Sequence, residues 1–434
     1  MAKMGKGKSK KAKSKENAND GKFSSAINAK DLTEEIELFK DQYGDGYAAI
    51  FDNGIKTIVP IRGKAFANHL RLRAFLDDKK IISKSKLESF VLQYEAFAIF
   101  GNQQHSLEIR TARQGSEFLY DLGTDVVRIA SKAWKIESND RLLFKRYPGM
   151  QRQVEPLAGS SLLRILEFIN IKDEDDQLLL IVFIVTAFIP DIPHPILAIH
   201  GPQGSAKSSL QRFLIQLLDP WATDDVPILN LKEFLQIVSH RWVIPLDNLG
   251  ELPPLYSDLL CKLVTGAGFT KRQLFTDDDD ITRAFRRVII LTGINLPINK
   301  PDILDRCIIL PLDRIQDNQR KDEAFLNKEF SNLRAGLLGD CFTLLSKAME
   351  YYPEIQLDEK PRLADFAMWG AAVAKALGRD VNDFVRAFKK NIDRQNEEAL
   401  DSSPLAAVII HYLRINNRLH GTPTDILKET QNHH

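Results

Sequence analysis

The sequence predicts an α/β fold: a parallel β-sheet with helices on both faces, preceded by an α+β region and followed by helices. Three patterns support this prediction. From about residue 162, short apolar runs alternate with helical patterns, as in strands joined by crossover helices. Between residues 106 and 138, apolar and polar residues alternate in short segments that Gly115 and Gly123 interrupt, which indicates antiparallel strands. From residue 322 to 400 the periodicity is helical.

Four parts of the chain follow from these patterns. The first 30 residues carry nine lysines against Glu16 and Asp20, and few side chains that could pack. We therefore expect a disordered basic tail that contacts the phosphates of DNA or RNA, or that serves only to keep the chain in solution. The other parts are an α+β N-terminal domain at 31–160 that ends in a turn-rich linker, the parallel-sheet core at 161–320, and a helical region at 321–434 with a small helical appendix at 402–429.

Periodicity and turn residues predict the individual elements. The apolar run at 178–190 predicts a buried helix just before the first strand of the sheet, because it is too short to cross a bilayer and ends at Pro190. The N-terminal domain is expected to contain helices at 31–43, 65–78 and 84–100. The core is expected to contain strands at 194–201, 226–230, 241–248, 287–295 and 306–312, and helices at 207–220, 231–240 and 255–268.

Cysteine usage and the N-terminus indicate the compartment. Cys261, Cys307 and Cys341 lie far apart in the sequence, which excludes metal-binding spacing and argues against a disulfide framework. The N-terminus is charged but has no apolar segment of the kind found in signal peptides. We expect a cytoplasmic protein with no membrane partner.

The segment HGPQGSAKSSL at 200–210 matches a phosphate-binding loop except at one position. In the pattern G-x-x-x-x-G-K-[ST], Gly201, Lys207 and Ser208 fit, but Ala206 stands where the second glycine belongs. If Ala206 has a negative φ, as at a helix start, the alanine costs little. We therefore expect ATP to bind through the loop residues Gly201, Pro202, Gln203, Gly204, Ser205, Ala206, Lys207, Ser208 and Ser209.

A carboxylate for Mg²⁺ is expected at the end of the strand WVIPLDN, forty residues after Lys207. Asp247 takes this position, and the hydroxyl of Ser208 would be the second protein ligand. The alternative is an acid that only caps a helix. The next position often carries a glutamate that activates water, but here it is Asn248. Either Asn248 orients the water, or Glu251 or another acid serves as the base.

Two further positions are candidates for contact with the γ-phosphate. Asn295 follows an apolar strand, and Thr292 within that strand is the second candidate. Arg306 ends a predicted helix before another strand, where an arginine of a ring ATPase can reach the neighbouring subunit's site. Alternatively, Arg306 interacts with its own helix dipole, or pairs with Asp302 or Asp305.

Between these elements lies a charged segment, GAGFTKRQLFTDDDDITRAFRR, that predicts a projecting hairpin. Lys271 and Arg272, next to Phe269 and Phe275, could line a pore and hold a DNA backbone. The acidic run at 277–280 would repel DNA and is expected either to face away from it or to pair with Arg283, Arg286 and Arg287. The alternative is a solvated charged hairpin.

These motifs, taken in order, resemble the ATPases of phages, plasmids and integrated mobile elements. GPQGSAKSSL, the segment from DNLGELPP to TDDDD, ILTGIN, PDILDRCIILPLDRI, PRLADFAMWG and GTPTDIL carry the resemblance, which covers roughly 106–429 and is densest over 195–315. Those proteins are ATP-binding proteins or primase-helicase ATPase modules, related to superfamily 3 helicases within the AAA+ class. The resemblance implies an AAA+ P-loop core whose C-terminal helices form a lid, and it makes Ala206 a family variant.

The resemblance also implies function. It favours an ATPase that uses ATP and Mg²⁺ and forms a hexameric ring on single- or double-stranded DNA, as a helicase or translocase. Lys207, Ser208, Asp247 and Asn295 take the family's site positions, with Arg306 and Lys271 less directly matched. Residues 1–160 show no zinc-ribbon cysteines or acidic catalytic triad, so a separate primase or initiator is expected. Two alternatives stay open: an ATP-controlled assembly or switch protein that does not unwind DNA, and a degenerate nucleotide-binding scaffold.

Overall fold

The chain forms two compact units, residues 1–105 and 106–434. The computed structural model describes residues 36–401 except 53–54, 80, 140–142, 229, 251, 273–279, 284–285, 297, 299 and 360, together with some residues between 409 and 426. The predicted tail at 1–30 lies outside the described residues, and so does most of the appendix at 402–429. Within the described part, no helix is long and apolar enough to cross a membrane.

The smaller unit is a three-stranded antiparallel sheet with two helices packed on it. Its strands are β1 (Glu37–Lys40), β2 (Gly46–Asp52) and β3 (Ile55–Pro60), and its helices are α2 (Lys64–Asp78) and α3 (Lys84–Phe100). The two helices confirm the predictions at 65–78 and 84–100. The described residues of the predicted helix at 31–43 instead include β1, so that prediction is wrong there.

Tertiary contacts explain why a strand replaces that helix. Phe39 is fully buried, and its ring stacks on Tyr47 at 6.3 Å between centroids. Because Lys40 pairs with Gly46 and Leu38 with Ala48, β1 gains both backbone hydrogen bonds and a buried face from β2. Local helical periodicity does not contain this information.

The larger unit begins with a four-stranded antiparallel sheet, as the sequence predicted. In order β4-β5-β6-β7, its strands are Thr111–Gln114, Glu117–Asp121, Asp125–Ala130 and Ala133–Ser138. Tyr120 on β5 packs edge-on against Phe188 and tilted against Phe342, both from the rest of the larger unit. The sheet thus shares the large core, and the boundary between the units lies at residue 105 rather than near 160.

The centre of the larger unit is a parallel sheet of four strands in the order β13-β8-β12-β9. Every residue of β9 and β12 is buried, and alternate residues point to opposite faces, so both faces are covered. This confirms the predicted mixed α/β fold. Its strands are β8 (Ile196–His200), β9 (Val243–Leu246), β12 (Val288–Gly293) and β13 (Cys307–Pro311), and its helices are α5 (Lys207–Leu218), α6 (Leu231–His240), α7 (Pro254–Thr265) and the one-turn α8 (Pro301–Leu304).

The strand expected at 226–230 is not formed by the described residues of that segment. Val226 donates one hydrogen bond to the carbonyl of Pro245, at 2.8 Å, beside β9. Pro227 follows, and it has no N–H with which to continue a ladder. The segment therefore touches the edge of the sheet without extending it.

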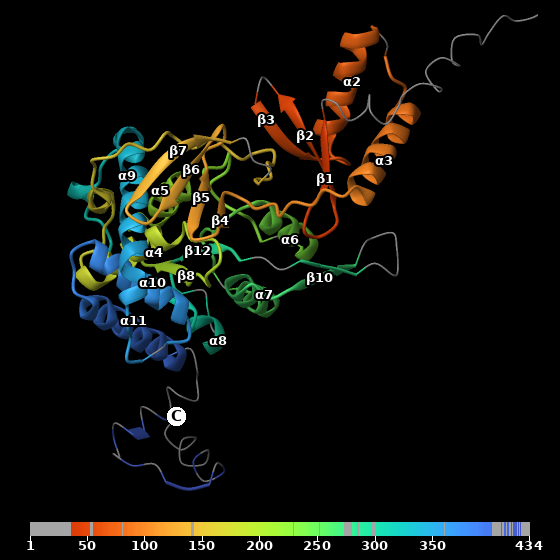
Figure 1. Cartoon of the computed structure of the whole chain (residues 1–434). Helices are drawn as coiled ribbons and strands as arrows, with labels where there is room; N and C mark the ends of the chain where they lie inside the picture. The colour runs from red at the N-terminus through yellow and green to blue at the C-terminus, as the bar shows by residue number, and fades with distance from the viewer. Residues whose placement is uncertain are drawn as a thin grey trace, which may run out of the picture. The chain divides into compact units, whose positions relative to one another are not determined.

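Helices complete the larger unit. The predicted buried helix is α4 (Glu174–Thr186), and Figure 1 shows it among the C-terminal helices α9, α10 and α11. The side chain of Asp173, the residue before α4, accepts backbone hydrogen bonds and caps the first turn of the helix. The apolar residues of α4 are buried on nearly all sides, as expected for a helix that other helices surround. The C-terminal helices are α9 (Glu323–Tyr351), α10 (Ala364–Ala376) and α11 (Val381–Asp401), and the short 3-10 segments are Leu162–Phe168, Asp317–Gln319 and Tyr352–Glu354.

The predicted projecting hairpin is present as a two-stranded antiparallel ribbon. It is formed by β10 (Phe269–Arg272) and β11 (Asp280–Arg283). Lys271 and Arg272 lie on β10, while their side chains and the residues between the strands lie outside the described part of the structure.

Candidate nucleotide site

Three segments meet at one edge of the parallel sheet because parallel strands end at the same edge. The loop at 201–206 follows β8, Asp247 follows β9, and Thr292 lies near the end of the intervening strand β12. This edge is where open α/β sheets bind ligands. A cavity of about 250 Å³ opens there, lined by Gln203, Gly204, Ser205, Ala206, Lys207, Ser208, Ser209, Asp247, Asn248, Thr292 and Ile294.

The loop after β8 turns sharply into helix α5. Gly201 and Gly204 have φ angles of +151° and +79°, which suit glycine. Ala206 also has a positive φ, +65° with ψ 27°, in the left-handed region just before the first helical residue Lys207. The condition under which the alanine would cost little, a negative φ, is therefore not met. An alanine in this conformation costs roughly 1–2 kcal/mol that a glycine would not.

Lys207 folds back onto the loop that precedes it. Its Nζ donates to the carbonyls of Gly201 at 2.7 Å and Pro202 at 3.0 Å, and to the hydroxyl of Ser205 at 3.3 Å. Partial burial lowers the pKa of Lys207, and the nearby charge of Asp247 opposes that shift. These acceptors hold the ammonium at the mouth of the loop, beside the cavity that it lines.

Asp247 is the centre of a hydrogen-bond chain across three elements. Its Oδ1 accepts from the hydroxyl of Ser208 at 3.1 Å and from the hydroxyl of Thr292. The Thr292 oxygen in turn accepts from the backbone N–H of Asn248 at 2.8 Å. Thr292, which the sequence offered only as a second candidate for γ-phosphate contact, here ties the end of β9 to β12. Thr292 follows a run of apolar residues within β12, and this was the available signal for its role.

The donor set fits a magnesium ion. A hydroxyl oxygen and a carboxylate oxygen, from Ser208 and Asp247, lie 3.1 Å apart beside the loop. Hard oxygen donors in small number are typical of Mg²⁺ sites that are completed by phosphates and water. No group of three or more His, Cys, Asp or Glu side chains that could form an all-protein metal site occurs among the described residues.

Arg306 makes the intramolecular contacts that the sequence offered as its alternative. Its Nη1 pairs with Oδ1 of Asp302 at 2.7 Å and also donates to the Asp302 carbonyl. The side chain is only 12% exposed. Arg306, followed by Arg362, lowers the pKa of Asp302 to about 2. A role for Arg306 across a subunit interface stays a prediction.

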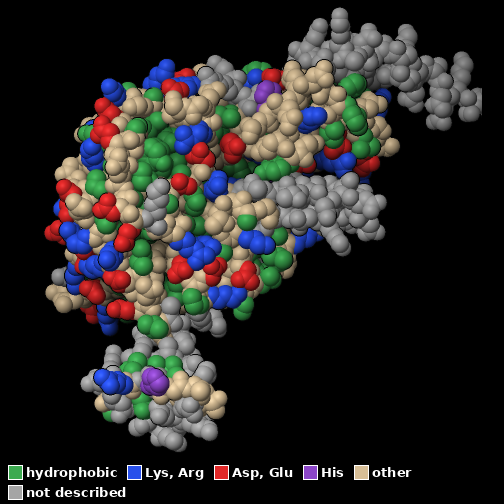
Figure 2. All heavy atoms as spheres, turned by 60° about the horizontal axis from the view of Figure 1, so that its bottom comes forward, with side chains coloured by type: hydrophobic (Ala, Val, Ile, Leu, Met, Phe, Trp, Pro, Cys, Tyr) green, Lys and Arg blue, Asp and Glu red, His purple; other side chains and the backbone are tan. Residues whose placement is uncertain are grey.

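The remaining predicted residues are not brought into this cluster by the described contacts. Asn295 is exposed after β12 and does not line the cavity. Glu251 lies outside the described residues, as do the side chains of Lys271 and Arg272. On the face shown in Figure 2, the Lys and Arg side chains that are described are interspersed with Asp and Glu rather than gathered into one basic surface.

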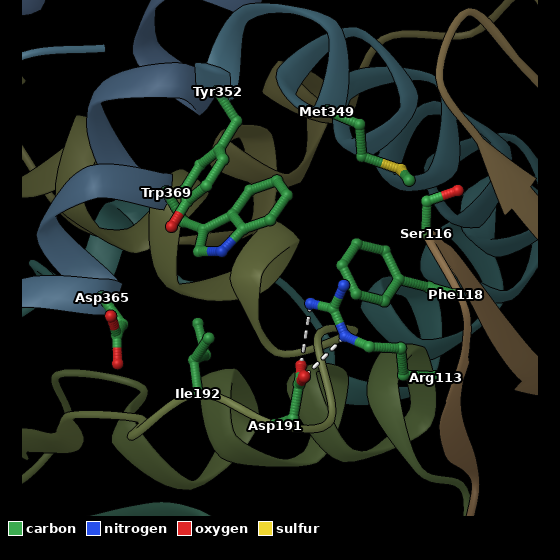
Figure 3. Close-up of a pocket in the computed structure, with 9 residues that line it drawn as sticks. All are labelled: Arg113, Ser116, Phe118, Asp191, Ile192, Met349, Tyr352, Asp365 and Trp369. Atoms are coloured by element: carbon green, nitrogen blue, oxygen red, sulfur yellow. Dashed lines mark hydrogen bonds and ion pairs between the residues drawn. The ribbon is translucent and has the colours of Figure 1, made fainter. Parts of the chain in front are cut away.

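A second cavity, of about 350 Å³, lies between the antiparallel sheet and the C-terminal helices. Figure 3 shows Phe118, Tyr352 and Trp369 around it, with Arg113 paired to Asp191 across its floor. Tyr352 and Trp369 stack on each other at 4.1 Å between ring centroids. Trp369 and Asp365 belong to the PRLADFAMWG motif, which is far from the phosphate loop in the sequence. This motif therefore contributes to the lining of the second cavity.

Comparison with known families identifies this chain's relatives. The model of the family described as "Actinomycete integrative conjugative element replication protein" matches residues 160–397. The chain belongs to this family. The match covers more than half of the chain and includes the parallel sheet, the phosphate loop, α9, α10 and most of α11. The predicted resemblance to mobile-element replication proteins is thereby confirmed.

Other comparisons give distant likenesses. The apo structure of the NrS-1 C-terminal region (A form) is 14% identical and has a TM-score of 0.46, covering 80% of this chain and 73% of that chain. The X-ray structure of JCV Helicase is 13% identical with a TM-score of 0.27, covering 51% of this chain and 65% of that chain. No curated protein sequence matches the chain significantly. The family assignment rests on the family match alone.

Proposed function

We propose that this member of the replication-protein family is an AAA+ ATPase that hydrolyses ATP and moves along or unwinds DNA. The observation that carries the proposal is the pairing of a phosphate loop with a strand-end carboxylate. Ser208, at the start of α5, and Asp247, at the end of β9, lie within hydrogen-bond distance beside a cavity that the loop lines. Either residue alone is common; together at this edge they match the requirements of phosphoryl transfer.

In this proposal the loop and the strand-end residues have separate roles in binding and hydrolysing ATP. The backbone N–H groups of the loop and of the first turn of α5 bind the phosphates. Lys207 exchanges its loop carbonyl acceptors for phosphate oxygens. Mg²⁺, when bound through Ser208 and Asp247, neutralises charge on the phosphates. Asn248 or Glu251 orients the attacking water, and Thr292 holds Asp247 in place.

Assembly and DNA binding are the finer parts of the proposal. We propose a hexameric ring in which Arg306 leaves Asp302 and reaches the nucleotide of the adjacent subunit. The β10–β11 ribbon would carry Lys271 and Arg272 toward single- or double-stranded DNA, and a separate primase or initiator would act with the ring. Both arginine and lysine bind phosphates, so each assignment is chemically consistent.

One set of measurements tests the function. ATP turnover is measured with and without single-stranded and duplex DNA, strand separation is measured on a forked duplex, and mass is measured by light scattering with and without ATP. We expect DNA-stimulated turnover, strand separation and an ATP-dependent ring. Turnover without DNA stimulation or strand separation would instead favour an ATP-controlled assembly protein. Absence of turnover would leave a nucleotide-binding scaffold.

A further inference from the structure

The segment that follows β13 is attached to the phosphate loop. The N–H of Leu312 donates to the carbonyl of His200 at 2.8 Å, and the N–H of Ile315 donates to the carbonyl of Gly204 at 3.1 Å. The carbonyl of Leu312 lies so close to Gly201 that a Cβ built there would be 2.2 Å from it. Leu312 and Ile315 thus attach the start of this segment to the loop.

Arg320, at the end of this segment, lies directly against the loop. A Cβ built on Gly204 would be 2.6 Å from Nη2 of Arg320 and 3.5 Å from its Cζ. The φ of Gly204, +79°, already favours glycine. The absence of a side chain at 204 thus also lets a guanidinium pack on the loop backbone, next to a residue that lines the cavity.

The guanidinium is weakly held in this position. Its described ion pair is with Asp317, at 3.3 Å, and the two side chains are 48% and 77% exposed. Exposed pairs of this kind contribute little to stability, so a competing anion can replace the carboxylate. A guanidinium binds phosphate oxygens with two parallel hydrogen bonds, which favours such an exchange.

We propose that Arg320 is a nucleotide-binding residue that acts within its own subunit: it leaves Asp317 and binds the phosphate chain of the nucleotide seated in the loop. No sequence motif pointed to Arg320, because its position depends on the path of the chain after β13. The proposal rests on the proposed function, since it requires a nucleoside di- or triphosphate in the cavity at Gly204.

The test is ADP binding by the full chain, measured by titration calorimetry in the presence of Mg²⁺. Arg320→Ala is expected to weaken ADP binding about tenfold, or about 1.4 kcal/mol. Arg314→Ala is the matched control: Arg314 lies in the same segment, is 65% exposed and also faces Asp317, at 4.0 Å, but atoms of Arg320 are the ones nearest Gly204. It should change ADP binding less than twofold.

Turnover gives the second readout. With ATP as substrate, Arg320→Ala should raise KM about tenfold and change kcat little, as expected for lost binding in the ground state and transition state alike. Wild-type affinity in Arg320→Ala overturns the inference while leaving the proposed function intact. Equal weakening by Arg314→Ala and Arg320→Ala also overturns it, because general charge would then explain the effect. A folded wild-type chain that binds no ADP overturns both proposals.

Discussion

Charged side chains make different kinds of contact at the edge of the parallel sheet and at the junction between the antiparallel sheet and the rest of the larger unit. At the junction, Arg110 and Asp219 are fully buried and paired at 2.8 Å. The other Arg110 nitrogens donate to the carbonyls of Asp121, Gln151 and Pro220, and the second oxygen of Asp219 accepts from Trp221, Trp242 and Val243. The described contacts of both side chains are therefore all with the protein itself.

At the edge of the parallel sheet, by contrast, the polar groups surround a cavity that is open to a ligand. Lys207 donates to loop carbonyls, which phosphate oxygens would replace in the proposed function, and Ala206 and Asn248 have positive φ angles of 65° and 52°. Strain and exchangeable contacts of this kind are typical of ligand sites. The comparison teaches that the cluster expected to stabilise the fold and the cluster proposed to bind nucleotide are different parts of the same unit, so substitutions can separate their effects.

The largest effect on stability is expected from the junction. Asp219→Ala should lower the free energy of unfolding by about 3–5 kcal/mol, because it leaves Arg110 charged and buried without its partner. Urea unfolding of the full chain measures this. A loss below about 1 kcal/mol would mean that water reaches Arg110, and the contrast between the two regions would fail.

The converse substitution is Lys207→Ala. It should reduce ATP turnover at least about a thousandfold, or about 4 kcal/mol in the barrier, while unfolding in urea stays within about 1 kcal/mol of wild type. Stability should change little because the described hydrogen bonds of the Lys207 ammonium are all to the partly exposed loop that precedes it. Wild-type turnover in the folded variant would contradict the nucleotide-site assignment.

A smaller effect is expected at Thr292, which belongs to both kinds of region. Its side chain is 1% exposed, and its hydroxyl joins Asp247 to the N–H of Asn248. Thr292→Val should cost about 0.5–1.5 kcal/mol of stability, because the part-buried hydrogen bond from the Asn248 N–H to the hydroxyl is lost. It should also lower turnover about tenfold by freeing Asp247. Thr292→Ser keeps the hydroxyl and should restore both; equal loss in both variants would indicate packing instead.

These results bear on what sequence could predict. Four of the five expected core strands, the phosphate loop and Asp247 follow from local patterns, and the structure has them close to where they were expected. The strand at β1 and the shared core around Tyr120 depend on contacts between distant segments. The pairing of Arg306 with Asp302, four residues away, is local, and the sequence offered it as one of the alternatives. Arg320 is the clearest case. Its position beside Gly204 depends on the path of the chain after β13, which no spacing rule describes.

The smallest effect on stability is expected at Ala206, where a substitution can distinguish backbone strain from an effect on turnover. Glycine relieves the left-handed penalty of roughly 1–2 kcal/mol but gains conformational freedom in the unfolded chain, worth about 0.4–1 kcal/mol. Ala206→Gly should therefore stabilise the unit by about 0.5–1 kcal/mol, with turnover within about tenfold of wild type.

A matched alanine-to-glycine substitution in a helix provides the control, because it should change stability in the opposite direction. Ala335 lies in the middle of α9, where the backbone is right-handed helix, so Ala335→Gly should destabilise the same unit by about 1 kcal/mol. Opposite changes in the urea midpoint of the two variants would confirm that the loop at Ala206 is strained in solution. Destabilisation by both would mean that residue 206 has a negative φ in the absence of nucleotide. A gain in turnover of a hundredfold or more in Ala206→Gly would show that the alanine restrains the site itself, and the strain would then belong to its regulation rather than to its fold.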